Sequence, residues 1–507
     1  MTNENISTHP DLGGLLDAIE IIDIQGNVTD SEIVAALTDD SRAVVPGAMF
    51  VAVRGVASDG HAYIGKALAA GARYIVAEEK ADNLPEGVIW IRVADTREAL
   101  GRLAARWYGD PSEELTLVGV TGTNGKTTVA TLLYSLARLL GHKAGLISTV
   151  ANIVDGASEA ADHTTPHPLY LNALLRRMAD AGCTFAAMEV SSHAADQHRI
   201  AGLSYDGGIF TNLTRDHLDY HKTVEAYLRA KKSFFDGLPA EAFALVNADD
   251  RNGAVMVQNT AARKATYSIR GVADYTVRVV EDRIDGMLLD FDGTQAETLF
   301  AGRFNASNLA AVYGAALLLG WPREDVLRAV SALHPVAGRF QPFRSADGVT
   351  AIVDFAHTPD ALVNVLDTIA EIVSDGTRVY CVCGAGGDRD KGKRPLMAAA
   401  ADVRCDNLVL TSDNPRSEDP GAIIDDMLAG LSPERRAAAT VIVDRREAIA
   451  RTIAAAQPGD VVLVAGKGHE TEQITKTRTE HFDDREECRR ALDARTNKQT
   501  DNAVLPL

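Results

Sequence analysis

Cysteine and long apolar runs are scarce in this chain. Its 507 residues include five cysteines, an odd number spread from residue 183 to residue 488, which argues against a disulfide framework. Cys381 and Cys383 alternate with Tyr380 and Val382 in a strand-like run, so we interpret them as buried thiols and not as metal ligands. No stretch is long enough to span a bilayer, and the first residues lack a basic segment followed by an apolar one. We therefore expect a cytoplasmic protein with no membrane insertion.

Positive charge is also in short supply. Lys and Arg number 51 against 70 Asp and Glu, a formal net charge of −19, so a nucleic-acid backbone would be repelled overall. We expect a monomer whose ligands are small molecules, and no nucleic-acid partner. Hydrophobic residues make up 46% of the chain, as in an ordinary globular protein, and the length implies about three domains.

Apolar runs that end in polar or glycine-rich turns recur from about residue 115 onward, each followed by a helix-like stretch. This alternation is typical of parallel α/β sheets. It occurs in two series, LTLVGV, FAAMEV, GGIFTN and FALVNADD, and then TAIVDF, RVYCVCG, NLVLTSD and DVVLVAG. Between them lie a predicted hairpin, DYTVRVVEDRIDGMLLDFDG, and a predicted hinge near residue 338. We therefore predict three α/β domains: residues 1–112, residues 113–338 with a central P-loop ATPase-like parallel sheet, and residues 339–507 with a Rossmann-like sheet.

The segment VTGTNGKTT carries the clearest chemical signal. It follows the apolar run LTLVGV and precedes VATLLYSLARLLG, whose apolar residues have helical spacing. A glycine-rich turn between a strand and a helix directs backbone N–H groups and the helix dipole at an anion. Lys126 would pair with the β and γ phosphates of ATP, and Thr127 would bind Mg²⁺. The predicted ATP-binding loop comprises Gly122, Thr123, Asn124, Gly125, Lys126, Thr127 and Thr128.

Polar residues also follow the runs FAAMEV and GGIFTN, at strand ends where open α/β sheets place ligands. Glu189 ends the first of these runs, so it can share Mg²⁺ with Thr127. His217 and His221 are four residues apart, as in a helical zinc pair. The glutamate of HExxH is absent and no third ligand is obvious, so zinc is the weaker interpretation.

TGTNGKTT resembles the phosphate loop of the Mur ligase superfamily, the ATP-dependent peptide-bond formers of peptidoglycan assembly, and EVSSHA and NLTRDHLDYH resemble two further motifs of that family. The resemblance implies that Glu189 binds one Mg²⁺ and that His217 assists a second. YLRAKKSFF resembles a stretch whose lysine is carbamylated in many members and then ligates metal. By register this lysine is Lys231, with Lys232 as the alternative. Catalytic roles are implied for Lys126, His217 and Lys231.

The same resemblance assigns further nucleotide contacts. GRFNASN resembles the adenine-contacting stretch of the family, which points to Asn305 and Asn308, although an asparagine beside a helix start is as often a cap. Arg339 in GRF and Asp354 and His357 in DFAHTPD match positions near the ATP phosphates and ribose in relatives.

The amino-terminal segment TDDSRAVVPGAMFVAVRGVASDGHAYI resembles the UDP-binding domain of the family members that add the third amino acid. HTTPHP resembles another stretch of the same members. The contacts to the UDP-MurNAc-dipeptide that this implies are made by Ser41, Thr164, Thr165, Ser191, Gln197 and Arg199.

Three loops of the last domain, GGDRDKGKR, SDNPRSE and GKGHE, follow separate predicted strands, so their side chains can converge on one cleft. Two arginines and two acids suit a zwitterion with an extra carboxylate, because an arginine can hold a carboxylate in bidentate geometry. DNPR also resembles the signature of members that add meso-2,6-diaminopimelate. The predicted acceptor site comprises Arg389, Asp413, Asn414, Arg416, Gly466 and Glu470.

With the resemblance, the sequence predicts an ATP- and Mg²⁺-dependent ligase that adds meso-2,6-diaminopimelate to UDP-MurNAc-L-Ala-D-Glu through an acyl phosphate, in cytoplasmic synthesis of peptidoglycan precursors. Two alternatives stay open. One is a related ligase, either a lysine-adding one or folylpolyglutamate synthetase, and the UDP-binding resemblance and DNPR disfavour the latter. The other is a nucleotide-binding relative that has lost turnover.

Overall fold

The computed structural model describes residues 10–55, 58–81, 83–214 and 218–503. The chain forms two compact units. The first contains the residues up to Thr276 together with Asn308–Ala329, and the second contains Val277–Ser307 and the residues from Val330 onward. The chain passes from one unit to the other within β14 (Tyr275–Arg283), α10 (Arg303–Leu318) and α11 (Arg323–Ser331).

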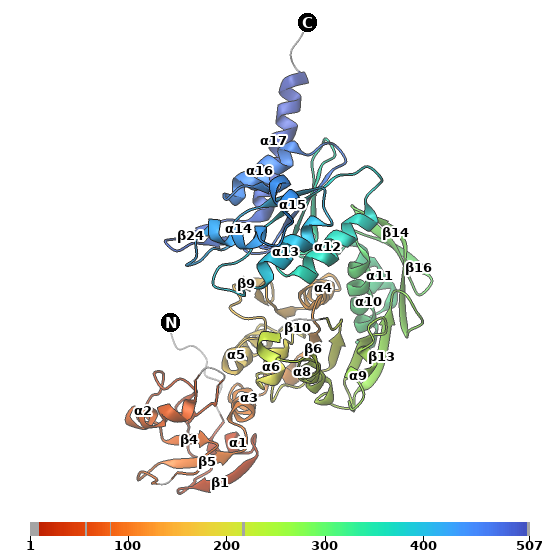
Figure 1. Cartoon of the computed structure of the whole chain (residues 1–507). Coiled ribbons are helices and arrows are strands. Elements are labelled where there is room, and N and C mark those ends of the chain that lie inside the picture. Colours follow the sequence, from red (N-terminus) through yellow and green to blue (C-terminus); the bar gives the residue numbers. More distant parts are fainter. Residues whose placement is uncertain (1–9, 56–57, 82, 215–217, 504–507) are drawn as a thin grey trace. The chain divides into compact units, whose positions relative to one another are not determined.

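The amino-terminal part of the first unit is built on a five-stranded sheet of order β1-β5-β4-β3-β2, in which β1 is antiparallel to β5 and the other pairs are parallel (Figure 1). Its strands are β1 (Ile21–Gln25), β2 (Leu37–Thr38), β3 (Met49–Val51), β4 (Tyr74–Ala77) and β5 (Ile89–Val93). The helices are α1 (Leu12–Leu16), α2 (Ile64–Ala69) and α3 (Thr96–Trp107), with 3-10 turns at Gly60–Tyr63 and Pro111–Glu114. Helix α3 starts where the Asp95 carboxylate accepts the first N–H groups.

The larger sheet of the first unit has the order β13-β12-β11-β6-β10-β7-β8-β9. The strands from β13 to β7 are parallel, whereas β8 and β9 are antiparallel. The strands are β6 (Thr116–Thr121), β7 (Ala144–Ile147), β8 (Asn152–Val154), β9 (Ala157–Glu159), β10 (Phe185–Glu189), β11 (Gly207–Phe210), β12 (Phe243–Asn247) and β13 (Arg263–Ser268). The helices are α4 (Lys126–Leu139), α5 (Pro168–Asp180), α6 (Ser192–Asp196), α7 (Leu218–His221), α8 (Val224–Asp236) and α9 (Gly253–Met256).

The second unit contains an antiparallel ladder formed by β14, β15 (Gly286–Phe291) and β16 (Thr294–Thr298), and a six-stranded sheet of order β17-β18-β22-β19-β20-β21. In the six-stranded sheet, β17 is antiparallel and the other pairs are parallel. Its strands are β17 (Gln341–Arg344), β18 (Thr350–Asp354), β19 (Val379–Cys383), β20 (Asn407–Leu410), β21 (Thr440–Val441) and β22 (Val461–Ala465), and a separate hairpin comprises β23 (Glu472–Ile474) and β24 (Thr479–His481). The helices are α12 (Pro359–Ile372), α13 (Lys393–Asp402), α14 (Pro420–Leu428), α15 (Pro433–Ala438), α16 (Arg445–Ala455) and α17 (Asp484–Ala503).

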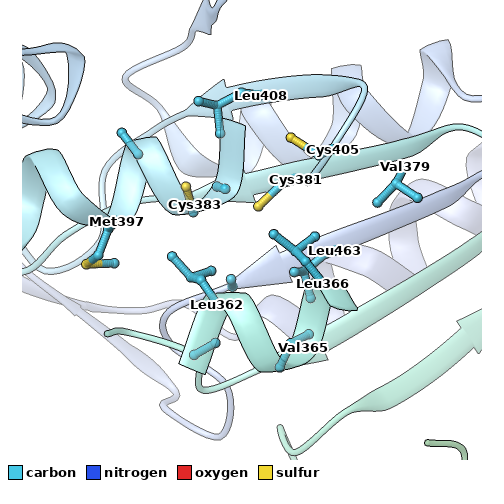
Figure 2. Close-up of a cluster of buried hydrophobic side chains, with 14 of the residues drawn as sticks. Leu362, Val365, Leu366, Val379, Cys381, Cys383, Met397, Cys405, Leu408 and Leu463 are labelled. Atoms are coloured by element: carbon cyan, nitrogen blue, oxygen red, sulfur yellow. The ribbon is translucent and has the colours of Figure 1, made fainter. Parts of the chain in front are cut away.

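A buried apolar core lies on one face of the six-stranded sheet. Figure 2 shows Leu362, Val365 and Leu366 of α12 on the side of the sheet that carries Cys381 and Leu463. Burying such side chains contributes roughly 1.5–3 kcal/mol each to folding. All five cysteines are buried free thiols, as predicted for Cys381 and Cys383, and burial raises the pKa of the Cys405 thiol to about 12. These thiols therefore serve packing.

The predicted fold class is confirmed, and all eight apolar runs are parallel strands. The predicted hairpin is confirmed as β14 and β15, and β16 pairs with β15 as a third antiparallel strand. The sequence interpretation did not include β7, β8, β9 and β13. None of the helices in the described ranges has the length and hydropathy that crossing a bilayer demands.

Candidate active site

The phosphate loop of the first unit joins β6 to α4, as the sequence predicts. Gly122 and Gly125 have φ values of 152° and 86°, which L-residues rarely adopt. A Cβ on Gly122 would lie 1.9 Å from Oγ1 of Thr211, and one on Gly125 would lie 2.6 Å from Oδ1 of Asn308. Both glycines are therefore required by conformation and by close neighbours, and Asn308 lies against the loop.

A second strand end supports this loop. The backbone N–H of Asn124 donates to Oδ1 of Asn212 at 2.9 Å, and the N–H of Thr123 donates to the Asn212 carbonyl oxygen at 2.8 Å. Oγ1 of Thr211 donates to the Asn124 carbonyl oxygen at 2.6 Å. The turn is thus fixed by residues that follow β11, which preorganises it for an anion.

Lys126 begins α4 and its ammonium stays with the loop. Nζ donates to the carbonyl oxygens of Gly122 and Thr123, at 2.9 Å each. Thr127 and Thr128 follow in the first helical turn and are buried. The positive helix end and the lysine together form a site for an anion.

Glu189 ends β10, which lies between β6 and β7. Its side chain is 1% exposed, and Oε1 accepts the N–H of Thr149 at 2.7 Å. Oε2 is buried, and within the described ranges no hydrogen-bond donor reaches it. A buried carboxylate oxygen that has no hydrogen-bond donor is stabilised by a bound cation. The residue therefore fits the Mg²⁺ ligand that the sequence predicts.

Lys231 and Lys232 are adjacent on α8 but have different partners. Nζ of Lys231, whose side chain is 1% exposed, donates to the Gly122 carbonyl oxygen at 2.7 Å and lies 4.6 Å from the centre of the Tyr227 ring. Nζ of Lys232 pairs with Asp236 at 2.6 Å. Lys231 therefore contacts the phosphate loop, and Lys232 forms an ion pair within its own helix.

The segment NLTRDHLDYH contains two histidines, and the structure describes one of them. His217 lies outside the described residues. His221 is 7% exposed, and its Nε2 lies 3.0 Å from Oγ of Ser192. In the part of the chain that the structure describes, no group of three or more His, Cys, Asp or Glu side chains is arranged to hold a metal ion, so the zinc interpretation gains no support there.

A pocket of about 240 Å³ opens beside Lys126 and Lys231. Its walls include the predicted ATP residue Lys126, the predicted metal ligand Lys231 and several predicted dipeptide contacts. They also include three residues that the sequence interpretation did not select, His163, Ser192 and His193. The full lining is Lys126, His163, Thr164, Thr165, Ser191, Ser192, His193, Arg199 and Lys231.

Hydrogen bonds connect the predicted dipeptide contacts. Oγ1 of Thr165 donates to the Glu189 carbonyl oxygen at 2.8 Å and accepts from the N–H of Ser191 at 3.1 Å. The Arg199 guanidinium donates to the Thr165 carbonyl oxygen at 3.0 Å and to Oε1 of Gln197 at 2.8 Å, and burial lowers the pKa of Arg199. Hydrogen bonds therefore hold Thr165, Ser191 and Arg199 in place along the pocket, with Gln197 behind the arginine.

The other two predicted dipeptide contacts are Thr164 and Ser41. Thr164 lines the pocket and its Oγ1 accepts from Oγ1 of Thr149 at 3.0 Å. Ser41 lies instead in the amino-terminal part, in the turn where the Asp40 carboxylate accepts the N–H of Arg42 at 2.9 Å. A contact of Ser41 with the ligand stays a prediction.

The acceptor residues of the second unit follow β19, β20 and β22, as predicted. A Cβ on Gly466 would lie 2.6 Å from Oδ2 of Asp413, and one on Gly386 would lie 3.0 Å from Nη1 of Arg416 and 3.6 Å from Cγ of Arg389. The structure thus brings the two arginines together at one glycine, and Asp413 together with Gly466.

Arg416 is held in a constrained loop. Its φ is 51°, its Nη1 donates to the Gly387 carbonyl oxygen at 2.9 Å, and its N–H donates to the Ile474 carbonyl oxygen at 2.9 Å. Ser417 beside it donates from Oγ to Asp388 at 2.6 Å. The loops after β19 and β20 are therefore fastened to each other, which fixes the guanidinium that would bind a carboxylate.

The remaining predicted nucleotide residues lie mostly near β18. The Asp354 carboxylate accepts the N–H of Phe340 at 2.7 Å, and burial raises its pKa. The Arg339 guanidinium lies 4.6 Å from the centre of the Phe355 ring. Nδ1 of His357 lies 2.8 Å from the Phe355 carbonyl oxygen, and burial lowers the pKa of this imidazole.

Asn305 is placed differently. It lies in the first turn of α10, and its Nδ2 donates to the Ala301 carbonyl oxygen at 2.9 Å. That bond is local to the start of the helix, and in it the side chain donates, whereas a capping side chain accepts a backbone N–H. An adenine contact by Asn305 stays a prediction.

Three family models match the chain. They are the Mur ligase family catalytic domain at residues 34–108, the Mur ligase middle domain at residues 120–316, and the Mur ligase glutamate ligase domain at residues 338–468.

The chain is also similar to named relatives over nearly its whole length. It is 56% identical over 475 residues to the UDP-N-acetylmuramoyl-L-alanyl-D-glutamate--2,6-diaminopimelate ligase of Phocaeicola vulgatus, with 94% of this chain and 98% of the relative covered. Identity to the ligase of the same name from Geobacillus kaustophilus is 44%, with 91% and 95% covered. A solved structure of a ligase of that name matches with a TM-score of 0.69 at 32% identity, covering 96% of this chain and 100% of the other. The MurF ligase of Thermotoga maritima in complex with ADP matches in fold, with a TM-score of 0.56 at 20% identity, covering 92% and 99%.

Proposed function

The chain belongs to the Mur ligase family, and we propose that it joins meso-2,6-diaminopimelate to UDP-MurNAc-L-Ala-D-Glu at the expense of ATP. The γ-phosphoryl group of ATP passes to the γ-carboxylate of D-glutamate, which gives an acyl phosphate and ADP. An amine of diaminopimelate then attacks the acyl carbon, phosphate leaves, and the amine loses a proton. The product is a peptide bond in a peptidoglycan precursor.

The observation that carries the choice of acceptor is the meeting of Arg389 and Arg416 at Gly386. Diaminopimelate has two amino-acid ends, so one carboxylate can pair with each guanidinium. L-Lysine lacks the second carboxylate, which would leave one arginine without its partner. This difference in charge favours diaminopimelate.

ATP binds through the phosphate loop in this proposal. The N–H groups of the loop and Lys126 neutralise the phosphates, and the fixed positions of Gly122 and Gly125 let the backbone approach them. Thr127 and Glu189 hold Mg²⁺, which when bound withdraws charge from the phosphoryl oxygens. His217 is a further ligand by resemblance. The contacts of Arg339, Asp354, His357 and the two asparagines with the nucleotide stay predictions.

Lys231 is the proposed site of carbamylation. The ammonium would lose a proton, and the resulting amine would add to CO₂ and lose a second proton, which converts a buried cation into an anion next to the loop. The contact with Gly122 and the burial of the side chain support Lys231, and the ion pair with Asp236 counts against Lys232. An anionic carbamate suits a magnesium ligand better than an ammonium does.

Part of the UDP-MurNAc-dipeptide occupies the pocket lined by Thr164, Thr165, Ser191 and Arg199, with Gln197 orienting the arginine. Ser41 contacts its nucleotide end. Residues 1–112 bind this substrate, residues 113–338 bind ATP, and residues 339–507 bind the amino acid. The enzyme works as a cytoplasmic monomer on these small molecules.

Omitting one substrate at a time tests the proposal. With UDP-MurNAc-L-Ala-D-Glu, meso-2,6-diaminopimelate, ATP and Mg²⁺ present, ADP and tripeptide product should form in equal amounts, and each omission should stop product formation. Tripeptide formation without ATP would contradict the mechanism. An absence of ADP from the complete mixture would favour the catalytically silent relative.

A further inference from the structure

Lys467 is fully buried among the predicted acceptor residues, although the sequence interpretation gave it no role. Its side chain is 0% exposed. Nζ donates to Oδ1 of Asn414 at 3.1 Å, to Oε2 of Glu470 at 3.1 Å and to the Glu472 carbonyl oxygen at 2.6 Å. An ammonium has three donors, so every one of them is used on the segments that follow β20 and β22.

These bonds determine how the Asn414 amide is oriented. Its Oδ1 accepts from Lys467 and also from the N–H of Ile474 at 3.0 Å, and its Nδ2 donates to Oε2 of Glu470 at 2.8 Å. The oxygen must face the two donors and the nitrogen must face the carboxylate. Asn414, Glu470 and Lys467 therefore form a closed triangle in which each side chain contacts the other two.

The triangle leaves one oxygen of Glu470 for a ligand. Oε2 accepts two hydrogen bonds, whereas Oε1 accepts none from the residues that the structure describes. The side chain of Glu470 is 34% exposed, so a ligand can reach it. A carboxylate fixed through one oxygen can present the other to an ammonium group without losing rotamer freedom on binding.

The same contacts extend to Arg416. The N–H of Arg416 donates to the Ile474 carbonyl oxygen at 2.9 Å, and Nε2 of Gln473 donates to the Asp413 carbonyl oxygen at 2.8 Å. Residues Glu472, Gln473 and Ile474 form the short strand β23. Lys467 binds the carbonyl of Glu472 in this strand. The lysine thus connects the strand that fixes the arginine with the acid that would take the amine.

We propose that Lys467 is a positioning residue for the amino-acid acceptor, which sets the distance between the ammonium-binding oxygen of Glu470 and the carboxylate-binding Arg416. This inference rests on the proposed function. A lysine that served stability alone would not need its partners to be two side chains of the acceptor site. Removing the ammonium should therefore affect the acceptor more than the other two substrates.

Steady-state kinetics of full-length Lys467→Met test this. We expect KM for meso-2,6-diaminopimelate to rise about tenfold or more, as for the loss of hydrogen bonds to a charged group, with KM for ATP and for the UDP substrate changed less than about threefold. Arg495→Met is the matched control. Arg495 is a cation whose side chain is 12% exposed, and it binds Asp347 and the carbonyls at the end of α16, so its loss should lower the melting temperature and leave all three KM values in place.

A double-mutant cycle separates positioning from a general loosening of the fold. Because Lys467 acts partly through Glu470, Lys467→Met combined with Glu470→Gln should raise KM for diaminopimelate by less than the product of the two single effects. If the increases in KM for diaminopimelate of the two single variants multiply in full in the double variant, the inference is wrong. An active wild type together with an unchanged KM for diaminopimelate in Lys467→Met would also overturn the inference while leaving the proposed function intact.

If Lys467→Met does not fold, Lys467→Gln, which keeps a hydrogen-bond donor, replaces it in the same comparison and decides in the same way. A wild type without turnover would count against the proposed function itself.

Discussion

Nζ of Lys231 donates to the Gly122 carbonyl oxygen at 2.7 Å, which connects α8 to the first glycine of the phosphate loop. The adjacent Lys232 pairs with Asp236 instead. This divergence follows from helix geometry, because neighbouring residues of an α-helix point about 100° apart. The chain thus offers two lysines of equal chemistry of which one contacts the loop.

Lys231→Gln should abolish bicarbonate-stimulated turnover, because glutamine cannot form a carbamate. Lys232→Gln is the matched control and should retain both turnover and the response to bicarbonate. ADP formation is measured for each variant with and without added bicarbonate. A Lys231→Gln enzyme that still responds to bicarbonate would rule out this lysine as the carbamylated residue.

Lys126→Ala should lower kcat by about 100-fold or more, since a preorganised cation at the transferred phosphoryl group is lost. The structure places this ammonium on the loop carbonyls of Gly122 and Thr123. Lys143→Ala, at an exposed lysine of the same unit, should leave kcat unchanged. Equal activity of the two variants would show that Lys126 takes no part in catalysis.

Glu189→Gln should weaken the Mg²⁺ dependence of turnover by about tenfold or more, because it removes the negative charge of a ligand. The amide oxygen can still accept the N–H of Thr149, so the fold should be kept. Magnesium titrations of ADP formation measure the change. Glu225→Gln, at a side chain that is 79% exposed, is the control, and half-saturation at the same Mg²⁺ concentration in both variants would refute the assignment.

His469→Phe should make the protein less sensitive to acid. Burial and the nearby Arg339 cation lower the pKa of His469 from 6.5 to about 3, so between these values the unfolded chain binds a proton that the folded protein does not. Stability is therefore highest above pH 6.5 and is lost as the pH falls, by up to ~1.4 kcal/mol per pH unit from this group. Denaturant unfolding at several pH values between 7.5 and 5 measures the slope, and an identical slope in wild type and variant would contradict the account.

Much of this fold could be predicted because strands buried on both faces read as continuous apolar runs. The runs that became β6, β10, β18 and β22 are of this kind, and polar loops follow each of them. Strand β7, with the sequence AGLI, was not predicted, since four small or apolar residues are as common within a helix. Strand β8 is short and antiparallel, lies between β7 and the edge strand β9, and lacks such a run.

The candidate site was predictable as far as motifs and strand ends reached. Lysine is mostly exposed in proteins, so the burial of Lys467 could not be read from GKGHE. His163 and His193 lie within quoted motifs, but only the folded chain brings them to one pocket with Lys126 and Lys231. The choice between Lys231 and Lys232 likewise depends on which face of α8 meets the phosphate loop.

The most direct measurement of the central claim is kcat/KM for meso-2,6-diaminopimelate and for L-lysine, determined in parallel with UDP-MurNAc-L-Ala-D-Glu, ATP, Mg²⁺ and bicarbonate, for the wild type and for Arg416→Met. We expect the wild type to prefer diaminopimelate by about 100-fold or more, since one acceptor carboxylate pairs with Arg416 in the proposed site, and Arg416→Met to lose most of that preference. A wild type that uses L-lysine as well as or better than diaminopimelate would keep the chain in its family and contradict the proposed acceptor.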